Sequence, residues 1–155
     1  MVQCLDLSLN FLRSEKMRSI IAALPPQIRE LNLSYNYCED VSCLASRLST
    51  NFSLVSLNLQ ENMIIDIRVL APALTLSAAT GSLKYLNLTN NNLDFSTEDK
   101  IEAFTALLRQ AKNLQVLRLH KMTKLKDTYH DSLISALCES ASAKSFRALE
   151  LDLPT

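Results

Sequence analysis

The sequence predicts an α/β protein: a right-handed solenoid of about six β-α repeats, with a parallel sheet on its concave face and helices on its convex face. A phrase of alternating leucines that recurs along the 155 residues is the first observation behind this prediction. The helix-like spacing of apolar residues between the phrases is the second. Self-similarity at intervals of about 20 to 50 residues is typical of stacked repeats. The marker leucines, spaced 26 to 32 residues apart, are Leu5, Leu31, Leu57, Leu86, Leu117 and Leu149.

Residues 1–155 are predicted to form one domain. The length is that of a single domain, and the repeat runs almost from end to end, so no stretch remains for a second module. Hydrophobic residues make up 48% of the chain and charged residues 21%, a balance that suits a globular protein with a buried core. The repeats begin near residues 2, 28, 54, 83, 114 and 146.

Each phrase is predicted to start with a short strand and to turn at an asparagine. Leu31 and Leu33 alternate with polar residues, and a period of two is typical of a strand with one buried face. A buried turn needs partners for its amide and carbonyl groups, and an amide side chain both donates and accepts. We therefore expect a hydrogen-bond ladder between repeats, formed by Asn10, Asn36, Asn62 and Asn91.

The segments between the phrases have the one-sided apolar spacing of helices that pack on a sheet. Pro25 and Pro26 end the first helix. Pro72 lies inside the third helical segment, so that helix is expected to be short, kinked or late to start. The residues predicted to mark helix starts are Ser14, Asp40, Ser96 and Thr128.

The two ends of the array differ from its middle. Met122 and Pro154 replace the asparagine in the last two copies, which favours a degenerate carboxyl-terminal cap. At the other end, three explanations stay open: preceding repeats belong to a longer protein, a second copy covers the edge by self-association, or the exposure is tolerated. The residues expected to meet water on this first unit are Val2, Leu5, Leu7 and Leu12.

Composition argues against several classes of partner. The 16 Lys and Arg residues balance the 16 Asp and Glu residues, so no overall field favours nucleic acid or an anionic membrane. No apolar run approaches the roughly 20 residues of a membrane span, so membrane insertion is not expected. Four cysteines without zinc-ligand spacing or a disulfide framework predict free thiols in a reducing compartment, the cytoplasm. Cys38 takes the place of a small buried hydrophobe.

The sequence offers little for catalysis. His120 and His130 are the only histidines, and neither stands at a triad-like spacing from a nucleophile. A Gly-rich phosphate loop and a cluster of metal-ligating residues are both missing from the sequence. We predict a protein that is not an enzyme and uses no cofactor or metal.

The repeated phrases resemble leucine-rich repeats of the ribonuclease-inhibitor-like kind. Three of them carry the resemblance, which covers about residues 2 to 153 and implies a horseshoe segment that binds a protein on its concave sheet face. It implies no catalytic residues. The three phrases are Leu31-Asn-Leu-Ser-Tyr-Asn36, Leu57-Asn-Leu-Gln-Glu-Asn62 and Leu86-Asn-Leu-Thr-Asn-Asn91.

A second resemblance concerns the segment from Ala22 to Ser34, with its Leu24-Pro25-Pro26-Gln27 core. It is similar to repeats in effectors that intracellular bacteria such as Legionella deliver into host cells. This resemblance implies a secreted effector that acts in the host cell cytoplasm.

The outward positions of the six strands define the surface on which a partner is expected. Tyr85 is the favoured anchor, because aromatic residues dominate interface energetics, although an ordinary half-exposed strand tyrosine is the alternative. Arg118 and His120 lie with Lys121, Lys124 and Lys126 in a basic cluster that is either simply solvated or contacts an acidic or phosphorylated partner. The predicted partner-binding residues are Tyr35, Tyr37, Asn58, Gln60, Tyr85, Asn87, Thr89, Arg118 and His120.

We therefore predict a non-catalytic protein-interaction module that binds a protein through its concave face. The alternative is a structural segment whose open amino-terminal edge stacks on further repeats or on another copy. A nucleic-acid or lipid-headgroup binder that uses the basic cluster is a third possibility, against which the balanced charge argues.

Overall fold

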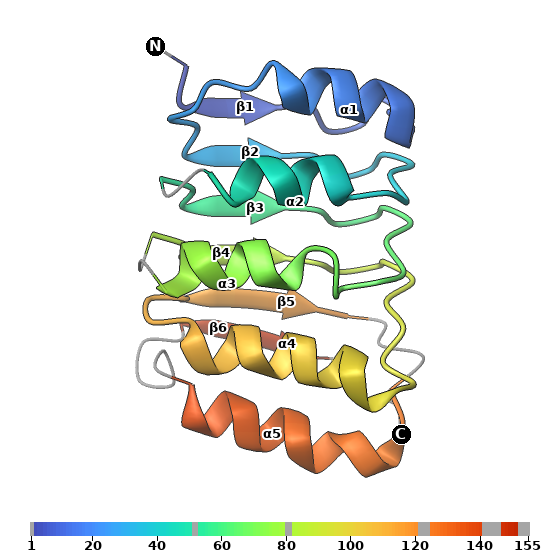
Figure 1. Cartoon of the computed structure of the whole chain (residues 1–155), viewed down its shortest axis with the longest axis vertical. Helices are drawn as coiled ribbons and strands as arrows, with labels where there is room; N and C mark the ends of the chain where they lie inside the picture. Colours follow the sequence, from blue (N-terminus) through green and yellow to red (C-terminus); the bar gives the residue numbers. More distant parts are fainter. Residues whose placement is uncertain (1, 51–52, 80–81, 121–124, 141–146, 152–155) are drawn as a thin grey trace.

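The computed structural model describes residues 2–50, 53–79, 82–120, 125–140 and 147–151. Strands and helices alternate along the chain (Figure 1). The strands are β1 (Cys4–Asp6), β2 (Glu30–Asn32), β3 (Ser56–Asn58), β4 (Tyr85–Asn87), β5 (Val116–Leu119) and β6 (Ala148–Leu151). The helices are α1 (Ser14–Ala22), α2 (Ser42–Leu48), α3 (Ala71–Ala79), α4 (Glu98–Gln110), the 3₁₀ turn η1 (Asp127–Tyr129) and α5 (His130–Glu139).

The strands form one parallel sheet in the order β1-β2-β3-β4-β5-β6, and the helices stack along one side of it (Figure 1). Each strand pairs only with its sequence neighbours, and each helix contacts the next helix, so the molecule is a stack of β-α units. The predicted α/β repeat solenoid is confirmed. Among the described residues, no helix is both long enough and apolar enough to cross a membrane.

The core lies between the sheet and the helices. The paired leucines of β2 to β5 are buried, as the period of two predicts. Helix residues such as Met17, Ile21 and Leu108 close the core from the other side. Phe95 and Phe104 pack with their ring centroids 5.4 Å apart. Cys38 is also buried in the core, and burial raises the pKa of its thiol to about 12.

The asparagine ladder is confirmed at its three inner positions. Asn62 Nδ2 donates to the carbonyl oxygens of Leu59 (3.1 Å) and Leu33 (2.9 Å), and its Oδ1 accepts from the amide of Cys38 (3.2 Å). Asn36 and Asn91 repeat this pattern toward the unit before each of them.

The prediction is wrong for Asn10. This side chain is exposed and donates only to the carbonyl oxygen of Ser8, 2.9 Å away. The physical reason lies in the direction of the ladder, because each inner asparagine bonds the turn of the preceding unit. Asn10 belongs to the first unit of the sheet, so it has no such turn to bond.

The predicted helix start is confirmed at Ser14, and the other three marked residues lie two positions before a helix. Ser14 is the first residue of α1, and its hydroxyl accepts from the amides of Glu39 and Asp40 in the next unit. Asp40 precedes the N-cap of α2 and accepts from the Ser42 amide. Ser96 lies before the N-cap of α4, and Thr128 lies within η1. Ser14 and Asp40 bond neighbouring loops and units, which the spacing along one unit does not reveal.

The prolines act as predicted. Helix α1 ends at Ala22, before the Pro pair. Helix α3 starts at Ala71, so Pro72 occupies its first turn, where the missing amide costs no helical hydrogen bond. Among the three behaviours expected for that segment, the late start is the one observed.

The exposure of the first unit is confirmed only in part. Val2 is 54% exposed, and Leu5 and Leu7 are half-buried, but Leu12 is buried against the second unit. The larger exposed apolar side chains are Leu9 and Phe11, at 67% and 69%, which the sequence did not single out. Met122 and Pro154, on which the predicted cap rests, lie outside the described residues.

Candidate functional site

The sheet face turned away from the helices, here called the concave face, presents two columns of strand side chains. Register places the first and third residues of each strand beside their counterparts on the next strand, as the repeat predicts. The first column is Cys4, Glu30, Ser56, Tyr85, Val116 and Ala148, and the second is Asp6, Asn32, Asn58, Asn87, Arg118 and Glu150.

Side chains of the second column form hydrogen bonds to the backbone just after the strands end. In β1 to β4 the side-chain oxygen of this residue accepts from the amide two positions later. Asn58 bonds the Gln60 amide at 3.1 Å, and Asn87 bonds the Thr89 amide at 3.0 Å. These local turns are a common use of Asn and Asp, and they fix the outward direction of the residues that follow.

Four side chains in the middle of the concave face form a continuous polar row. Gln60 Nε2 donates to the Tyr35 hydroxyl oxygen (3.0 Å), and Asn87 Nδ2 donates to Gln60 Oε1 (3.1 Å). Asn87 Nδ2 also approaches the Tyr85 hydroxyl oxygen at 3.4 Å. Asn87 is buried, so the row has a fixed centre from which the half-exposed Tyr85 projects.

The row continues into a charged group at the carboxyl-terminal end. The Arg118 guanidinium lies 5.8 Å from the centroid of the Tyr85 ring, and its Nη1 donates to the Tyr85 hydroxyl oxygen (3.3 Å). Arg118 Nε is 3.0 Å from Glu150 Oε2, and His120 Nε2 is 3.3 Å from the same oxygen. Its bond to His120 and its ion pair with Arg118 lower the pKa of Glu150.

The opposite end of the concave face is acidic. A shallow cavity of about 430 Å³ spans β1 to β4 and is lined by Asp6, Glu30 and Tyr85 among others. Bonds from Ser8 and Asn32 lower the pKa of Asp6, so its carboxylate is charged at neutral pH. The face therefore runs from two carboxylates through Tyr85 to the Arg118, His120 and Glu150 group.

The structure brings most of the predicted residues together. Tyr35, Gln60, Asn87, Tyr85, Arg118 and His120 lie in one connected row, and Asn58 and Thr89 support it through backbone turns. The exception is Tyr37, which lies after the strand and stacks on Phe11 with centroids 5.8 Å apart.

Glu150 is the member that sequence reasoning missed. Its position in the same column as Arg118 was the available signal, because opposite charges on neighbouring strands pair. The ion pair with Glu150 also means that the predicted basic cluster contains an acidic residue. Arg118 and His120 share the Glu150 carboxylate, Lys126 is exposed, and Lys121 and Lys124 lie outside the described residues.

Comparison with known proteins agrees with this architecture. A family model described as Leucine Rich Repeat matches residues 82–107. No curated protein matches the chain significantly. Among solved structures, the tropomodulin C-terminal domain of Caenorhabditis elegans superposes with a TM-score of 0.68 at 17% sequence identity, over 89% of this chain and 83% of that one. The molecule thus has a leucine-rich-repeat fold.

Proposed function

We propose that the chain is a non-catalytic interaction module that binds a protein through its concave face. The connected side-chain row from Tyr35 to Glu150 is the observation that carries this proposal. Leucine-rich-repeat folds generally mediate binding between proteins, and stacked units present one extended surface for it.

Size and chemistry support a compact interface. Six strands at about 4.8 Å spacing make a sheet some 25 Å wide, which matches a standard interface of about 800 Å² per partner. Tyr85 and Arg118 belong to the residue types that contribute most to interface energy. Their mutual contact holds both side chains in place before binding, which lowers the entropic cost of association.

Two matched arginines test the proposal. Arg118 on the concave face and Arg109 on α4 each pair with a glutamate of the next unit. The wild type, Arg118→Ala and Arg109→Ala are each immobilised and used to capture partner proteins, which are identified by mass spectrometry. This experiment compares the two faces directly. We expect a captured protein to be lost with Arg118→Ala and with Tyr85→Ala, and to be retained with Arg109→Ala.

Equal capture by all the variants would show that the concave face is not the binding surface. Thermal melting of each variant provides the folding control, because loss of an exposed ion pair changes stability by only about 0–1 kcal/mol.

The cellular role that we propose is that of a bacterial effector in the host cytoplasm. Its support is the resemblance of the segment from Ala22 to Ser34 to effector repeats, together with four free cysteines that suit a reducing compartment. A fusion to an adenylate cyclase that needs host calmodulin, expressed in an intracellular bacterium, tests this role. Host-cell cyclic AMP should rise only when the secretion system is intact, and an unchanged level would argue against delivery.

A second candidate function is self-association through the first unit. The exposed Leu9 and Phe11 favour it, since contiguous exposed apolar side chains mark association sites. Light scattering across a concentration series should then give a mass above the monomer's 17.4 kDa for the wild type. Phe11→Ser should restore the monomer, whereas Ile134→Ser on the exposed side of α5 should not.

A further inference from the structure

The residues just before the strands form a column of their own along the amino edge of the sheet. The first five carbonyls of this column each accept two amides of the next unit: Gln3 bonds Arg29 and Glu30, and Val55 bonds Lys84 and Tyr85. This backbone ladder holds the column in register. Its members are Gln3, Arg29, Val55, Lys84, Gln115 and Arg147.

The amino edge of the sheet carries positive charge without any acidic residue. The segments that lead into β2 to β6, residues 23–29, 49–55, 80–84, 111–115 and 140–147, contain five Lys or Arg residues and no Asp or Glu. The loops that follow the strands carry both signs of charge: the acidic residues are Glu39, Asp40, Glu61, Asp66 and Asp94, and the basic residues are Arg13, Arg68, Lys121, Lys124 and Lys126. A net charge of zero therefore conceals a cationic amino edge.

Arg29 and Lys84 of this edge differ from the cations that are paired with carboxylates elsewhere in the fold. Arg18, Arg68 and Lys100 each pair with a carboxylate, as do Arg109 and Arg118. Within the part of the chain that the structure describes, no ion pair joins Arg29 or Lys84 to a carboxylate. Both side chains are exposed, so their charges are available to a ligand.

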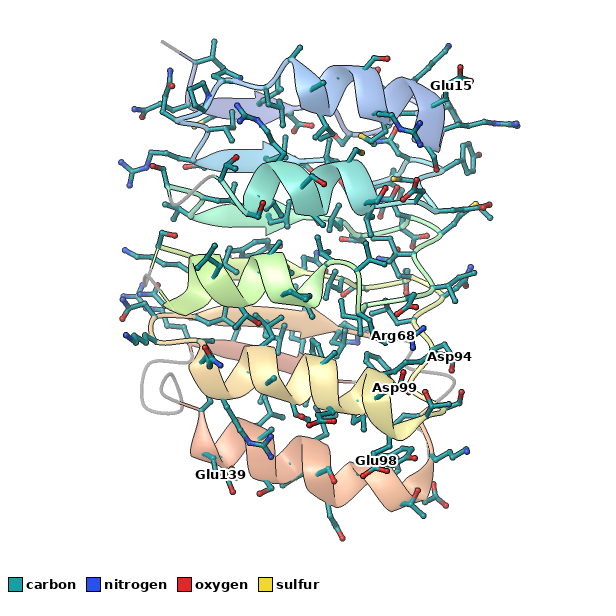
Figure 2. The ribbon with its side chains drawn as sticks, in the orientation of Figure 1. Glu15, Arg68, Asp94, Glu98, Asp99 and Glu139 are labelled. Carbon is teal, nitrogen blue, oxygen red and sulfur yellow. The ribbon has the colours of Figure 1, made fainter. Side chains whose placement is uncertain are left out.

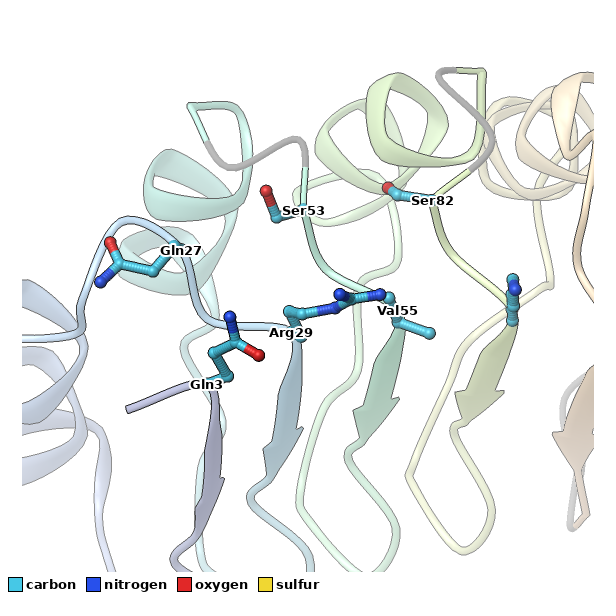
Figure 3. A pocket seen from close by; sticks show the side chains of 7 residues that line it. Gln3, Gln27, Arg29, Ser53, Val55 and Ser82 are labelled. Carbon is cyan, nitrogen blue, oxygen red and sulfur yellow. The ribbon is translucent and has the colours of Figure 1, made fainter. Parts of the chain in front are cut away.

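Arg29 and Lys84 line one groove of about 420 Å³. They stand two strands apart, about 10 Å at ordinary strand spacing, with Val55 between them. Figure 3 shows the Arg29 side chain extended along the row toward Val55, with Ser53 and Ser82 above it on the segments that enter β3 and β4. Gln3 and Gln27 complete the polar wall.

We propose that this groove binds a phosphoryl group carried by a serine or threonine side chain of a partner protein. A phosphoryl group has nearly two charges and three acceptor oxygens, which suit two cations and a polar rim. A single carboxylate carries one charge and two acceptor oxygens, so it would balance only half of the positive charge of the two cations. The groove lies on the edge of the sheet and does not depend on recognition by the concave face.

The test uses the whole chain and a short peptide, Ala-Ala-phosphoserine-Ala-Ala with blocked ends. Backbone amide NMR shifts follow its titration beside the serine peptide, the glutamate peptide and inorganic phosphate. We expect the phosphopeptide to shift the amides of Val55, Ser82 and Lys84, and to bind about tenfold more tightly than the glutamate peptide. The serine peptide should cause no shifts there.

Three variants locate the site. Arg29→Gln and Lys84→Gln should each weaken phosphopeptide binding about tenfold, because each removes one cation. Lys16→Gln, which removes an exposed charge at the start of α1, should leave it unchanged. Unchanged binding in the first two variants, or equal binding of the serine peptide, would overturn the proposal.

Two further outcomes would reassign the ligand. Inorganic phosphate that binds as tightly as the phosphopeptide would overturn a peptide-borne group in favour of the free ion. A single-stranded RNA of equal charge is tested in the same way. If it binds more tightly than the phosphopeptide and loses affinity in Arg29→Gln and Lys84→Gln, the ligand is nucleic acid and the proposal of a protein ligand is overturned. Loss of the Tyr85 side chain should leave phosphopeptide binding intact, which separates this proposal from the concave-face function.

Discussion

One residue in the turn after each of the first four strands, three positions beyond the strand's last residue, has a left-handed backbone conformation. The φ values are 59° at Leu9, 55° at Tyr35, 53° at Glu61 and 56° at Asn90. Each of these residues precedes an asparagine of the repeat, so the left-handed turn is part of the unit. Asn tolerates this conformation best among the four residue types, because the Cβ clash costs other non-glycine residues about 1–2 kcal/mol.

Leu9→Asn should therefore stabilise the protein by about 0.5–1 kcal/mol. The substitution relieves backbone strain and also removes an exposed apolar side chain. Urea unfolding checks the free energy. Val69→Asn is the control, because Val69 is exposed but has no positive φ, and it should give no gain. A gain of equal size in the control would attribute the effect to surface polarity rather than to the backbone.

Two asparagines at equivalent positions of the repeat are expected to contribute very differently to stability. Asn62→Ala leaves three carbonyls and one amide of the turns without their side-chain partner, so it should cost about 2–3 kcal/mol of unfolding free energy. Asn10→Ala should cost less than about 0.5 kcal/mol, because Asn10 is exposed and bonds only its own turn. Similar losses in both variants, measured by urea unfolding, would contradict the ladder as described.

At the scale of elements, the start of α4 is held by ionic contacts with the preceding loop. Asp94 accepts from the Ser96 amide (2.9 Å) and pairs with Lys100, and both side chains of that pair are mostly buried. Arg68 joins Asp66 of its own loop (2.6 Å) to Asp99 of α4. Figure 2 shows Arg68, Asp94 and Asp99 at the edge of the stack where the strands end.

This arrangement predicts a pH-dependent contribution from Asp94. Lys100 and Ser96 lower the pKa of its carboxyl, so the unfolded chain binds a proton at higher pH than the folded chain. The contribution is therefore complete above the unfolded value near pH 4 and is lost as the pH falls below it.

Asp94→Asn should destabilise the protein by about 1 kcal/mol at pH 7, and the difference should shrink at pH 3. Guanidinium unfolding at the two pH values measures it. Asp131→Asn, at an exposed position on α5, should show little change at either pH. A constant difference between pH 7 and pH 3 would mean that the charge of Asp94 is not the cause.

At the scale of the whole molecule, each unit is stabilised mainly by its two neighbours. Leu57 and Leu86, in the middle strands, are fully buried, whereas Leu5 is half-buried and Leu149 is 41% exposed. Stacked repeats open from their ends, because an end unit has a neighbour on one side only.

Amide hydrogen exchange should therefore be slowest in β3 and β4 and fastest in β1 and β6. Exchange followed by mass spectrometry resolves the six units, which lie on different peptides. Uniform protection along the sheet would indicate that the domain opens as a single cooperative unit.

The sequence predicted the stacking of the units well, because each repeat contains the pattern that places its strand and its turn. Leucine alternation placed the strands, their register and two outward columns, and the ladder at Asn36, Asn62 and Asn91 followed from one buried turn. The errors concern contacts between units. Ser14 bonds the next unit, Leu12 is buried by it, and Tyr37 stacks on Phe11, none of which the pattern of one unit contains.

The amino-edge groove was missed for the same reason. Arg29 and Lys84 are 55 residues apart in the sequence, and only the stacking of three units brings them to one groove. Balanced net charge also concealed them, because that quantity averages the cationic edge over the charges of the whole chain.

Site-specific photo-cross-linking tests the central claim, recognition through the concave face, most directly. A benzophenone amino acid replaces Tyr85 in one variant and Ile134, exposed on α5, in the other. Cross-links are then formed in cells and identified by mass spectrometry. The concave-face account predicts a protein adduct from position 85 and none of that protein from position 134. The same partner attached through position 134, with position 85 silent, would contradict it.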